Sequence, residues 1–302
     1  MDERQTLPPE IILLIAECAA LCAAQDPLNM GWAASLCLVC RSFRSAVTPI
    51  LYAHVVITED NMEHLSFLAH KAPEVLLYTR SVTFHSIPIL KHGAVEYFFG
   101  RLAHLRAFTG PNFLLDRICS VNEHLTIPTI FLTDAVTTSH FHYCLSGYAH
   151  SIMERATRLH IVIFLGEHHN EFSPVEVFLE YLIVDVLTDG EIGWVRTPGL
   201  LQHFSNALNR LGSLRRILFR PRCLSPGFTV ERFYSAAEEW GERKRDSRIW
   251  IDDTVSPSWV DDDGTDVHET LHLQDAVVGD ELWLRGRQLC PTSVPAPVAN
   301  KQ

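Results

Sequence analysis

The sequence has little positive charge. Lys and Arg number 25 against 36 Asp and Glu, so the formal net charge is -11. Residues 252–302 carry ten acids against three bases, a local charge of -7 that leaves only -4 for the rest of the chain. Binding to a phosphate backbone requires a clustered excess of Lys and Arg, which this balance does not offer. The composition therefore argues against a nucleic-acid partner.

Signals for export and for membrane crossing are also lacking. The apolar stretch 11–24 is preceded by Asp2 and Glu3 with Arg4 alone as a base, whereas export signals start with positive charge. Glu17 interrupts this stretch, which is shorter than the ~20 residues that span a bilayer. We therefore expect an intracellular protein, cytoplasmic or nuclear, with no membrane partner.

The signatures of common catalytic sites are missing as well. The sequence contains no G-x-S-x-G nucleophile elbow, no G-x-G-x-x-G dinucleotide turn and no G-x-x-x-x-G-K phosphate loop. We therefore predict that the chain is not an enzyme, and we assign no catalytic residue, no cofactor and no metal.

The eight cysteines show no regular framework of the kind that disulfides need. Most lie between apolar residues, which favours reduced, buried thiols in a reducing compartment. Cys18, Cys22, Cys37 and Cys40 have spacings that a four-thiolate zinc site could use, and a C-x-x-C can indicate redox chemistry. Both pairs lie in apolar helical stripes, whereas structural zinc sites usually lie in polar, turn-rich knuckles, so buried cysteines are the favoured interpretation.

Apolar residues are plentiful. Hydrophobic residues make up 47% of the 302 positions and charged residues 20%, both close to the averages of globular proteins. This length allows a small module and a larger domain, each with its own core.

The first apolar segment predicts a helix. Pro8, Pro9 and Glu10 fit a first helical turn, where backbone amides need no internal partner and acids are favourable. Apolar residues then lie on both sides of the helical wheel. One side carries Pro8, Ile11, Ile12, Ile15 and Ala19, and the other carries Leu13 and Leu14. We therefore expect this short helix to be covered on two sides.

A second helix and a strand follow. Leu36, Val39, Cys40, Phe43 and Val47 have the i, i+3, i+4, i+7 spacing of a helix that buries one face. Pro49 is expected to bend the chain into Leu51 and Tyr52, and the β-branched run 55–57 predicts a strand.

These residues, in this order, resemble the F-box in the form common among mushroom-type fungal proteins. The most specific parts are Leu7-Pro8 with Glu10-Ile11, the run LVCRSF from Leu38 to Phe43, and Pro49 with Leu51-Tyr52. The segment 20–34 departs from the compact family pattern because it lacks a clear Leu-Leu pair in the middle helix. The resemblance covers about a sixth of the chain.

The resemblance implies a substrate-recruiting subunit of an SCF-type cullin ubiquitin ligase. The F-box would bind a Skp-type adaptor on the cullin scaffold, and the rest of the chain would bind a target protein whose identity the sequence does not reveal. The residues implied to bind the adaptor, or to support its binding face, are Leu7, Pro8, Ile11, Ile12, Ile15, Leu36, Val39, Cys40, Phe43, Pro49, Leu51 and Tyr52.

Beyond residue 58, short β-like runs alternate with amphipathic segments. The expected strands are 81–85, 105–109, 128–133, 159–165, 214–220 and 248–251, and the expected helices are 95–102, 113–125, 141–156, 175–187, 200–211 and 229–243. The first strand starts are 24 and 23 residues apart, within the ~20–29 residues of a leucine-rich repeat, although later gaps are longer. We predict an α/β fold, an irregular solenoid similar to leucine-rich repeats, with an ordinary α/β layer fold as the main rival.

The expected organisation has three parts. Residues 1–58 form the small all-helical F-box, 59–252 the repeat-like substrate-binding domain, and 253–302 an acidic, partly disordered tail that starts where the α/β pattern ends.

Two other functions remain open. The run His268-Glu269-Thr270-Leu271-His272 matches the H-E-x-x-H pattern of zinc peptidases, in which both His bind Zn and Glu acts as base. The helix signal there is weak, and Asp275 and Val278 replace the Gly and the third His of the longer pattern. The other alternative is a repeat-type interaction scaffold without a role in a ligase. His140, His142, His168 and His169 receive no role, because nothing indicates a third ligand beside them.

Overall fold

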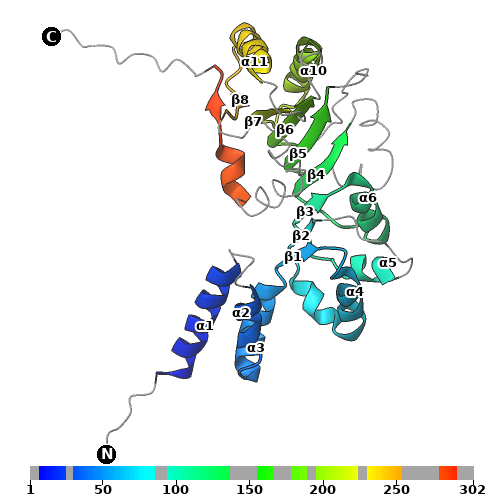
Figure 1. Ribbon diagram of the computed structural model, residues 1–302, viewed down its shortest axis with the longest axis vertical. Coiled ribbons are helices and arrows are strands. Elements are labelled where there is room, and N and C mark those ends of the chain that lie inside the picture. The colour runs from blue at the N-terminus through cyan, green and yellow to red at the C-terminus, as the bar shows by residue number, and fades with distance from the viewer. Residues whose placement is uncertain are drawn as a thin grey trace, which may run out of the picture. The chain divides into compact units, whose positions relative to one another are not determined.

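The computed structural model describes residues 7–24, 30–85, 94–136, 155–165, 178–188, 195–223, 230–253 and 279–290. The chain forms two compact units, Met1–Ile127 and Pro128–Gln302. Both units combine helices and strands, as Figure 1 shows. The predicted α/β class is confirmed.

The first unit begins with helices and continues with strands that alternate with helices. Its elements are α1 (Pro9–Ala24), α2 (Met30–Leu36), α3 (Arg41–Leu51), β1 (His54–Ile57), α4 (Met62–Lys71), the 3-10 helix η2 (Pro73–Tyr78), β2 (Ser81–Phe84), α5 (Ala94–Phe99), β3 (Ala107–Gly110) and α6 (Asn112–Val121). As predicted, Pro8 and Pro9 start α1, and the amide of Ile11 donates to the carbonyl of Pro8 at 3.0 Å.

Helix α3 differs from the prediction at both ends, because Leu36, the first residue of the predicted stripe, belongs to α2 instead. It begins after Cys40, whose sulfur accepts a hydrogen bond from the amide of Phe43 at 3.5 Å. Pro49 was expected to bend the chain, but it lies inside α3, which continues to Leu51. Proline has no amide hydrogen and therefore removes one hydrogen bond from the helix. The loss disturbs little here, because Pro49 lies near the end of α3.

Strands β1, β2 and β3 are parallel and neighbour one another in chain order. His54 lies opposite Ser81, and Ser81 lies opposite Ala107. The steps between these matching positions are 27 and 26 residues long. The helical segments between the strands supply the crossover that a parallel pair requires. The expected strands 81–85 and 105–109 thus correspond to neighbouring parallel strands, β2 and β3.

Aromatic side chains form much of the core behind these strands. Phe84 on β2 contacts Phe99 of α5 at 6.2 Å between ring centroids and Phe108 of β3 at 5.9 Å. Gly110 ends β3 where a Cβ atom would lie 2.9 Å from the ring of Phe84. A glycine is therefore required at this position by packing.

The second unit is built on longer strands. Its elements are β4 (Thr129–Val136), β5 (Arg158–Phe164), β6 (Tyr181–Thr188), α10 (Thr197–Arg210), β7 (Arg216–Cys223), α11 (Glu231–Lys244), β8 (Ile249–Ile251), the 3-10 helix η3 (Gly279–Leu284) and β9 (Arg287–Gln288). Strands β4 to β8 pair in chain order and are all parallel, whereas β9 pairs antiparallel with β8.

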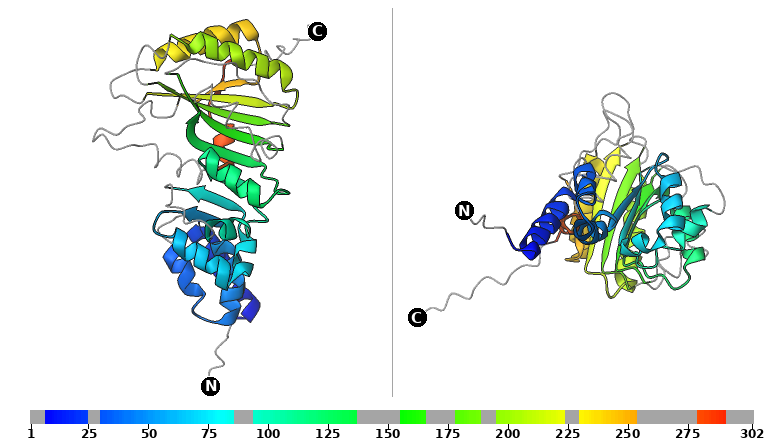
Figure 2. Two further views of the ribbon diagram at one scale, coloured as in Figure 1. Left: turned by 90° about the vertical axis from the view of Figure 1, so that its right-hand side faces the viewer. Right: turned by 90° about the horizontal axis from the view of Figure 1, so that it is seen from below.

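Helices α10 and α11 pack against one face of this sheet. Phe219 of β7 contacts Phe204 of α10 at 5.1 Å and Phe233 and Trp240 of α11 at 6.0 and 5.8 Å. Figure 2 shows both helices lying along the strands. Because side chains alternate along a strand, Arg220 points to the other face of the sheet.

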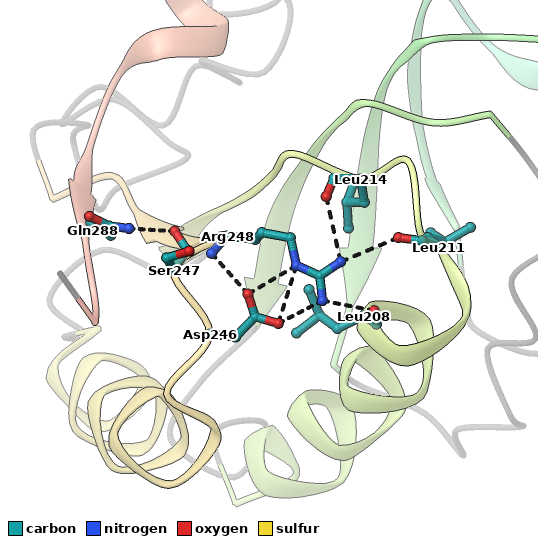
Figure 3. A network of polar contacts seen from close by, with 7 residues as sticks. All are labelled: Leu208, Leu211, Leu214, Asp246, Ser247, Arg248 and Gln288. Atoms are coloured by element: carbon teal, nitrogen blue, oxygen red, sulfur yellow. Dashed lines mark hydrogen bonds and ion pairs between the residues drawn. The ribbon is translucent and has the colours of Figure 1, made fainter. Parts of the chain in front are cut away.

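Arg248 joins the start of β8 to the end of α10, as Figure 3 shows. Its guanidinium donates to the carbonyls of Leu208 at 2.9 Å, Leu211 at 3.3 Å and Leu214 at 3.5 Å. The guanidinium Nη2 also donates to a carboxylate oxygen of Asp246 at 2.7 Å, and hydrogen bonding to Arg248 lowers the pKa of the Asp246 carboxyl. The last carbonyls of a helix lack internal partners, so Arg248 satisfies the end of α10 with positive charge.

The C-terminal segment 279–290 packs on the sheet, although it falls within the acidic tail that was expected over residues 253–302. Trp283 and Leu282 of η3 contact Ile183 and Leu218, and Trp283 meets Tyr181 edge to face at 6.4 Å. The short apolar run that contains Leu282 and Trp283 was not predicted, because it follows a long acidic stretch in the sequence.

Gly286 allows the turn between η3 and β9, and we predict that Gly286→Ala lowers the free energy of unfolding of the second unit by about 2–4 kcal/mol. Its φ is 87°, and a Cβ atom there would lie 2.5 Å from the carbonyl oxygen of Ile251. Urea titration followed by tryptophan fluorescence measures the loss. Gly199→Ala is the matched control, because a Cβ at Gly199 meets nothing within 4 Å. Equal stability of the two variants would contradict the prediction.

Most predicted elements are present, with shifted ends. Six expected strands correspond to β2, β3, β4, β5, β7 and β8, the run 55–57 corresponds to β1, and four expected helices correspond to α5, α6, α10 and α11. The prediction of a helix over 175–187 is wrong, because β6 occupies Tyr181–Thr188. A strand buried on both faces reads as a continuous apolar run and mimics a buried helix. The expected helix 141–156 lies almost entirely outside the described residues.

Candidate functional site

Helices α1, α2 and α3 pack through small side chains. Ala20 and Ala23 of α1 are buried against Ala33 of α2 and Val47 of α3. Partly buried apolar residues complete this cluster: Leu36, Cys37, Ile50 and Leu51. The fully buried residues of α1 are therefore alanines, and none of its large aliphatic side chains is fully buried.

Four large aliphatic side chains lie on the outer face of α1. Leu14, Ile15 and Leu21 are each 54% exposed, and Ile11 is 43% exposed. With the exposed Cys18 and Cys22, they have the spacing i, i+3, i+4, i+7, i+10 and i+11, which places them on one side of the helix. We call Ile11, Leu14, Ile15, Cys18, Leu21 and Cys22 the outer stripe. It contains no charged residue.

The turn between α2 and α3 adds exposed apolar groups to the same helical segment. Leu38 is 79% exposed and Val39 is 64% exposed, and Trp32 of α2 is also exposed. The amide of Val39 donates to the carbonyl of Leu36 at 3.1 Å, which fixes the turn. So many exposed large apolar side chains on one short helical segment make it a candidate protein-binding face.

The residues predicted to bind the adaptor divide by exposure. Exposed members are Leu7, Pro8, Ile11, Ile12, Ile15, Val39 and Cys40, and partly buried members are Leu36, Phe43, Pro49, Leu51 and Tyr52. Leu36 and Leu51 pack on the alanine cluster, so their part is to support the helices.

The sequence prediction did not include Leu14, Leu21, Trp32 and Leu38, although they are among the exposed apolar residues of this segment. The spacing of the outer stripe was readable in the sequence, but apolar residues on every side of α1 concealed which face is free.

The expectation of buried cysteines is wrong for most of the helical segment. Cys18, Cys22 and Cys40 are exposed, Cys37 is partly buried, and all four thiols are free. Apolar neighbours in the sequence do not imply burial when the stripe that contains them faces outward. In the described part of the chain, no three or more His, Cys, Asp or Glu side chains gather as a metal site would require.

A charged cluster lies inside the second unit. The imidazole Nε2 of His160 lies 2.8 Å from a carboxylate oxygen of Asp185, and the Nε atoms of Arg220 and Arg222 lie 3.2 and 3.6 Å from the other. Phe131 stacks on the imidazole at 3.7 Å between ring centroids. Every strand from β4 to β7 thus contributes at least one side chain to this group of contacts. We call His160, Asp185, Arg220 and Arg222 the Asp185 cluster.

The Asp185 cluster is shielded from solvent, since its four side chains are at most 1% exposed. Burial alone would raise the pKa of Asp185, but the charges of Arg220, His160 and Arg222 outweigh it and hold that pKa far below its usual range. Asp185 is therefore an ionised carboxylate that joins three neighbouring strands. This arrangement fits a structural role, because a bound molecule would need access to the polar atoms.

The zinc-peptidase alternative cannot be placed. His268, Glu269 and His272 lie outside the described residues, as do His140, His142, His168 and His169. Among the residues that are described, no helix is both long and apolar enough to cross a bilayer.

Comparison with known proteins gives no relative. No family model, no curated protein and no solved structure matches the chain.

Proposed function

We propose that this chain is the substrate-recruiting F-box subunit of an SCF-type cullin ubiquitin ligase. The observation that carries the proposal is the outer stripe of α1, a charge-free apolar face on helices whose core is already filled by alanine. The motifs Leu7-Pro8 and LVCRSF, which resemble the F-box, supply the kind of partner, a Skp-type adaptor.

The size of the exposed surface supports a stable contact. Burying a large aliphatic side chain fully contributes about 1.5–3 kcal/mol, and the four in the outer stripe are about half exposed. Covering them, with Leu38 and Val39, offers several kcal/mol toward binding. Helices α2 and α3 cover the inner side of α1, and the adaptor would cover the outer stripe.

The rest of the chain would hold a target protein. We interpret it as an irregular solenoid similar to leucine-rich repeats, because within each unit parallel strands follow one another in chain order. Doubly wound α/β folds instead reverse strand order at a switch point. The steps of 26 and 27 residues in the first unit fall in the repeat range of ~20–29 residues. Such proteins bind partners over extended surfaces.

The mechanism would be proximity. The chain would catalyse no step itself, and by binding adaptor and target together it would raise the effective concentration of a target lysine near the charged ubiquitin carrier.

Binding of the purified full chain to a purified Skp-type adaptor tests the proposal. We expect a one-to-one complex in calorimetry with a Kd of about 1 μM or tighter, which binds the N-terminal part of a cullin in size-exclusion chromatography. A chain that is folded by circular dichroism yet shows no binding heat at about 50 μM adaptor would reject the ligase role. The interaction scaffold would then be the better interpretation.

A further inference from the structure

The outer stripe contains two thiols. Cys18 and Cys22 are four residues apart on α1, so their side chains lie one helical turn apart on the same side of the helix. Both are exposed and both are free. Leu14 and Leu21 lie beside them in the stripe and are themselves half exposed. A group attached to either sulfur would therefore project from the face that the proposed adaptor would cover.

The thiols of α1 differ from the buried thiol of the first unit. Cys119 of α6 is 1% exposed, and burial together with the charge of Asp116 raises its pKa to about 12. A thiol needs access and ionisation to react with an electrophile, so Cys119 is inert. The first unit thus carries an accessible pair on α1, a further exposed thiol at Cys40, and a buried thiol that serves as an internal negative control.

We propose that Cys18 and Cys22 form a thiol-modification site for small-molecule disulfides, and that modification there blocks docking of the adaptor. This inference rests on the proposed function. Modification and docking compete, because the adaptor would cover both sulfurs and an adduct would occupy the adaptor's place.

The reaction is thiol–disulfide exchange. The Sγ of Cys18 or Cys22 loses its proton and attacks one sulfur of the small disulfide, whose S–S bond breaks as a mixed disulfide forms. The departing thiolate takes up a proton and leaves as a free thiol. No electrons are lost overall, since the small disulfide is the oxidant, and excess thiol reverses the step.

The adduct acts on binding without disturbing the fold. Glutathione, for example, adds carboxylates and an ammonium group to an apolar face, and burying these groups in the interface is unfavourable. The inner face of α1, with Ala16, Ala20 and Ala23, lies on the opposite side and stays packed. We therefore expect adaptor affinity to fall by about tenfold or more while the helices remain folded.

The experiment treats the full chain with oxidised glutathione, counts adducts by intact mass and peptide mapping, and measures adaptor affinity before and after. We expect adducts on Cys18 and Cys22 but none on Cys119, a loss of affinity of about tenfold or more, and recovery with dithiothreitol. In the Cys18→Ala/Cys22→Ala variant, adaptor affinity should be the same before and after glutathione treatment, which separates the effect of these two thiols from that of the exposed Cys40. The Cys290→Ala variant, changed at a thiol of the second unit, should respond like the unmodified sequence.

The outcomes separate this inference from the proposed function. Failure of the untreated chain to bind the adaptor rejects the proposed function and the switch with it. Binding that persists with both sulfurs modified, or a chain that takes up no glutathione at either position, overturns the switch alone. If the alanine variant binds poorly, protection from N-ethylmaleimide decides: an adaptor that fails to shield Cys18 and Cys22 in the unmodified sequence contradicts the site.

Discussion

Replacing Leu14 and Ile15 by aspartate should reduce adaptor affinity by more than about 100-fold and leave thermal unfolding of the chain nearly unchanged. Both side chains are 54% exposed in the free protein, so folding does not depend on their burial. In the complex, each carboxylate would enter an apolar contact, at a cost of several kcal/mol, and each ~1.4 kcal/mol is a tenfold loss of affinity. Calorimetric titration with the adaptor and a thermal melt measure the two effects.

The matched control is Phe67→Asp. Phe67 is an exposed aromatic residue on α4, outside the helices that resemble the F-box. This variant should bind the adaptor like the unmodified chain. Equal affinity of all three proteins would mean that the outer stripe is not the interface. A lowered melting temperature in the double variant would instead show that Leu14 and Ile15 support the fold.

Substitution of Asp185 by asparagine should cost the second unit about 3–5 kcal/mol, the usual loss when one partner of a buried ion pair is removed. The carboxylate is shared by His160, Arg220 and Arg222, and asparagine cannot balance their charge. A domain is typically stable by only about 5–15 kcal/mol, so the variant should be close to unfolding. Urea titration with tryptophan fluorescence, which reports on Trp240, Trp250 and Trp283 of this unit, measures the loss.

The same carboxylate predicts how stability depends on pH. The pKa of Asp185 in the folded protein is below its value of about 4 in the unfolded chain, so its contribution is complete above about pH 5. As the pH falls below about 4, the unfolded state binds a proton that the folded state does not, and the contribution decreases. The stability gap between the unmodified protein and Asp185→Asn should therefore narrow in acid.

Glu180→Gln provides the control for Asp185. Glu180 pairs with Arg215 at 3.4 Å, but Arg215 is 68% exposed, and surface pairs contribute about 0–1 kcal/mol. This variant should unfold almost like the unmodified protein. A similarly small loss for Asp185→Asn, or a gap that is constant with pH, would show that the buried carboxylate does not stabilise the folded chain.

The α/β alternation was predictable because its signals are local. Short runs that contain β-branched residues, such as 81–84 and 158–164, are separated by segments with helical periodicity, and each predicts its own element. The observed ends of the elements differ from the predicted ends by a few residues. Caps and turns depend on contacts between residues that are distant in the sequence, so local patterns do not locate them.

β6 shows where local signals fail. In its sequence YLIVDVLT, Asp185 is the one charged residue, and a lone acid in a largely apolar run is compatible with a buried helix as well as with a strand. What makes the acid acceptable in a strand are His160 and Arg220, which are 25 and 35 residues away. One sequence does not reveal such distant pairing, so neither β6 nor the Asp185 cluster was predicted.

The candidate docking face was predicted only in part, for a similar reason. The motifs identified α1 and the α2–α3 turn as the relevant segment, but alanine decided which side of α1 faces inward. Small residues allow close helix packing, and their preference over the larger Leu14 and Ile15 depends on the shapes of α2 and α3. That choice is a property of the folded segment.

The strand order of the second unit has a consequence for synthesis on the ribosome. Strands β4 to β8 pair in the order in which they leave the ribosome, so each new strand can add to the one made before it. Until β9 is made, the newest strand presents unpaired backbone groups to other chains, which is the usual starting point of aggregation. β9 joins β8 in the opposite direction and is only two residues long, with Arg287 at its edge. A short, charged strand is a poor template for further strands, so the growing edge is closed once β9 has been made.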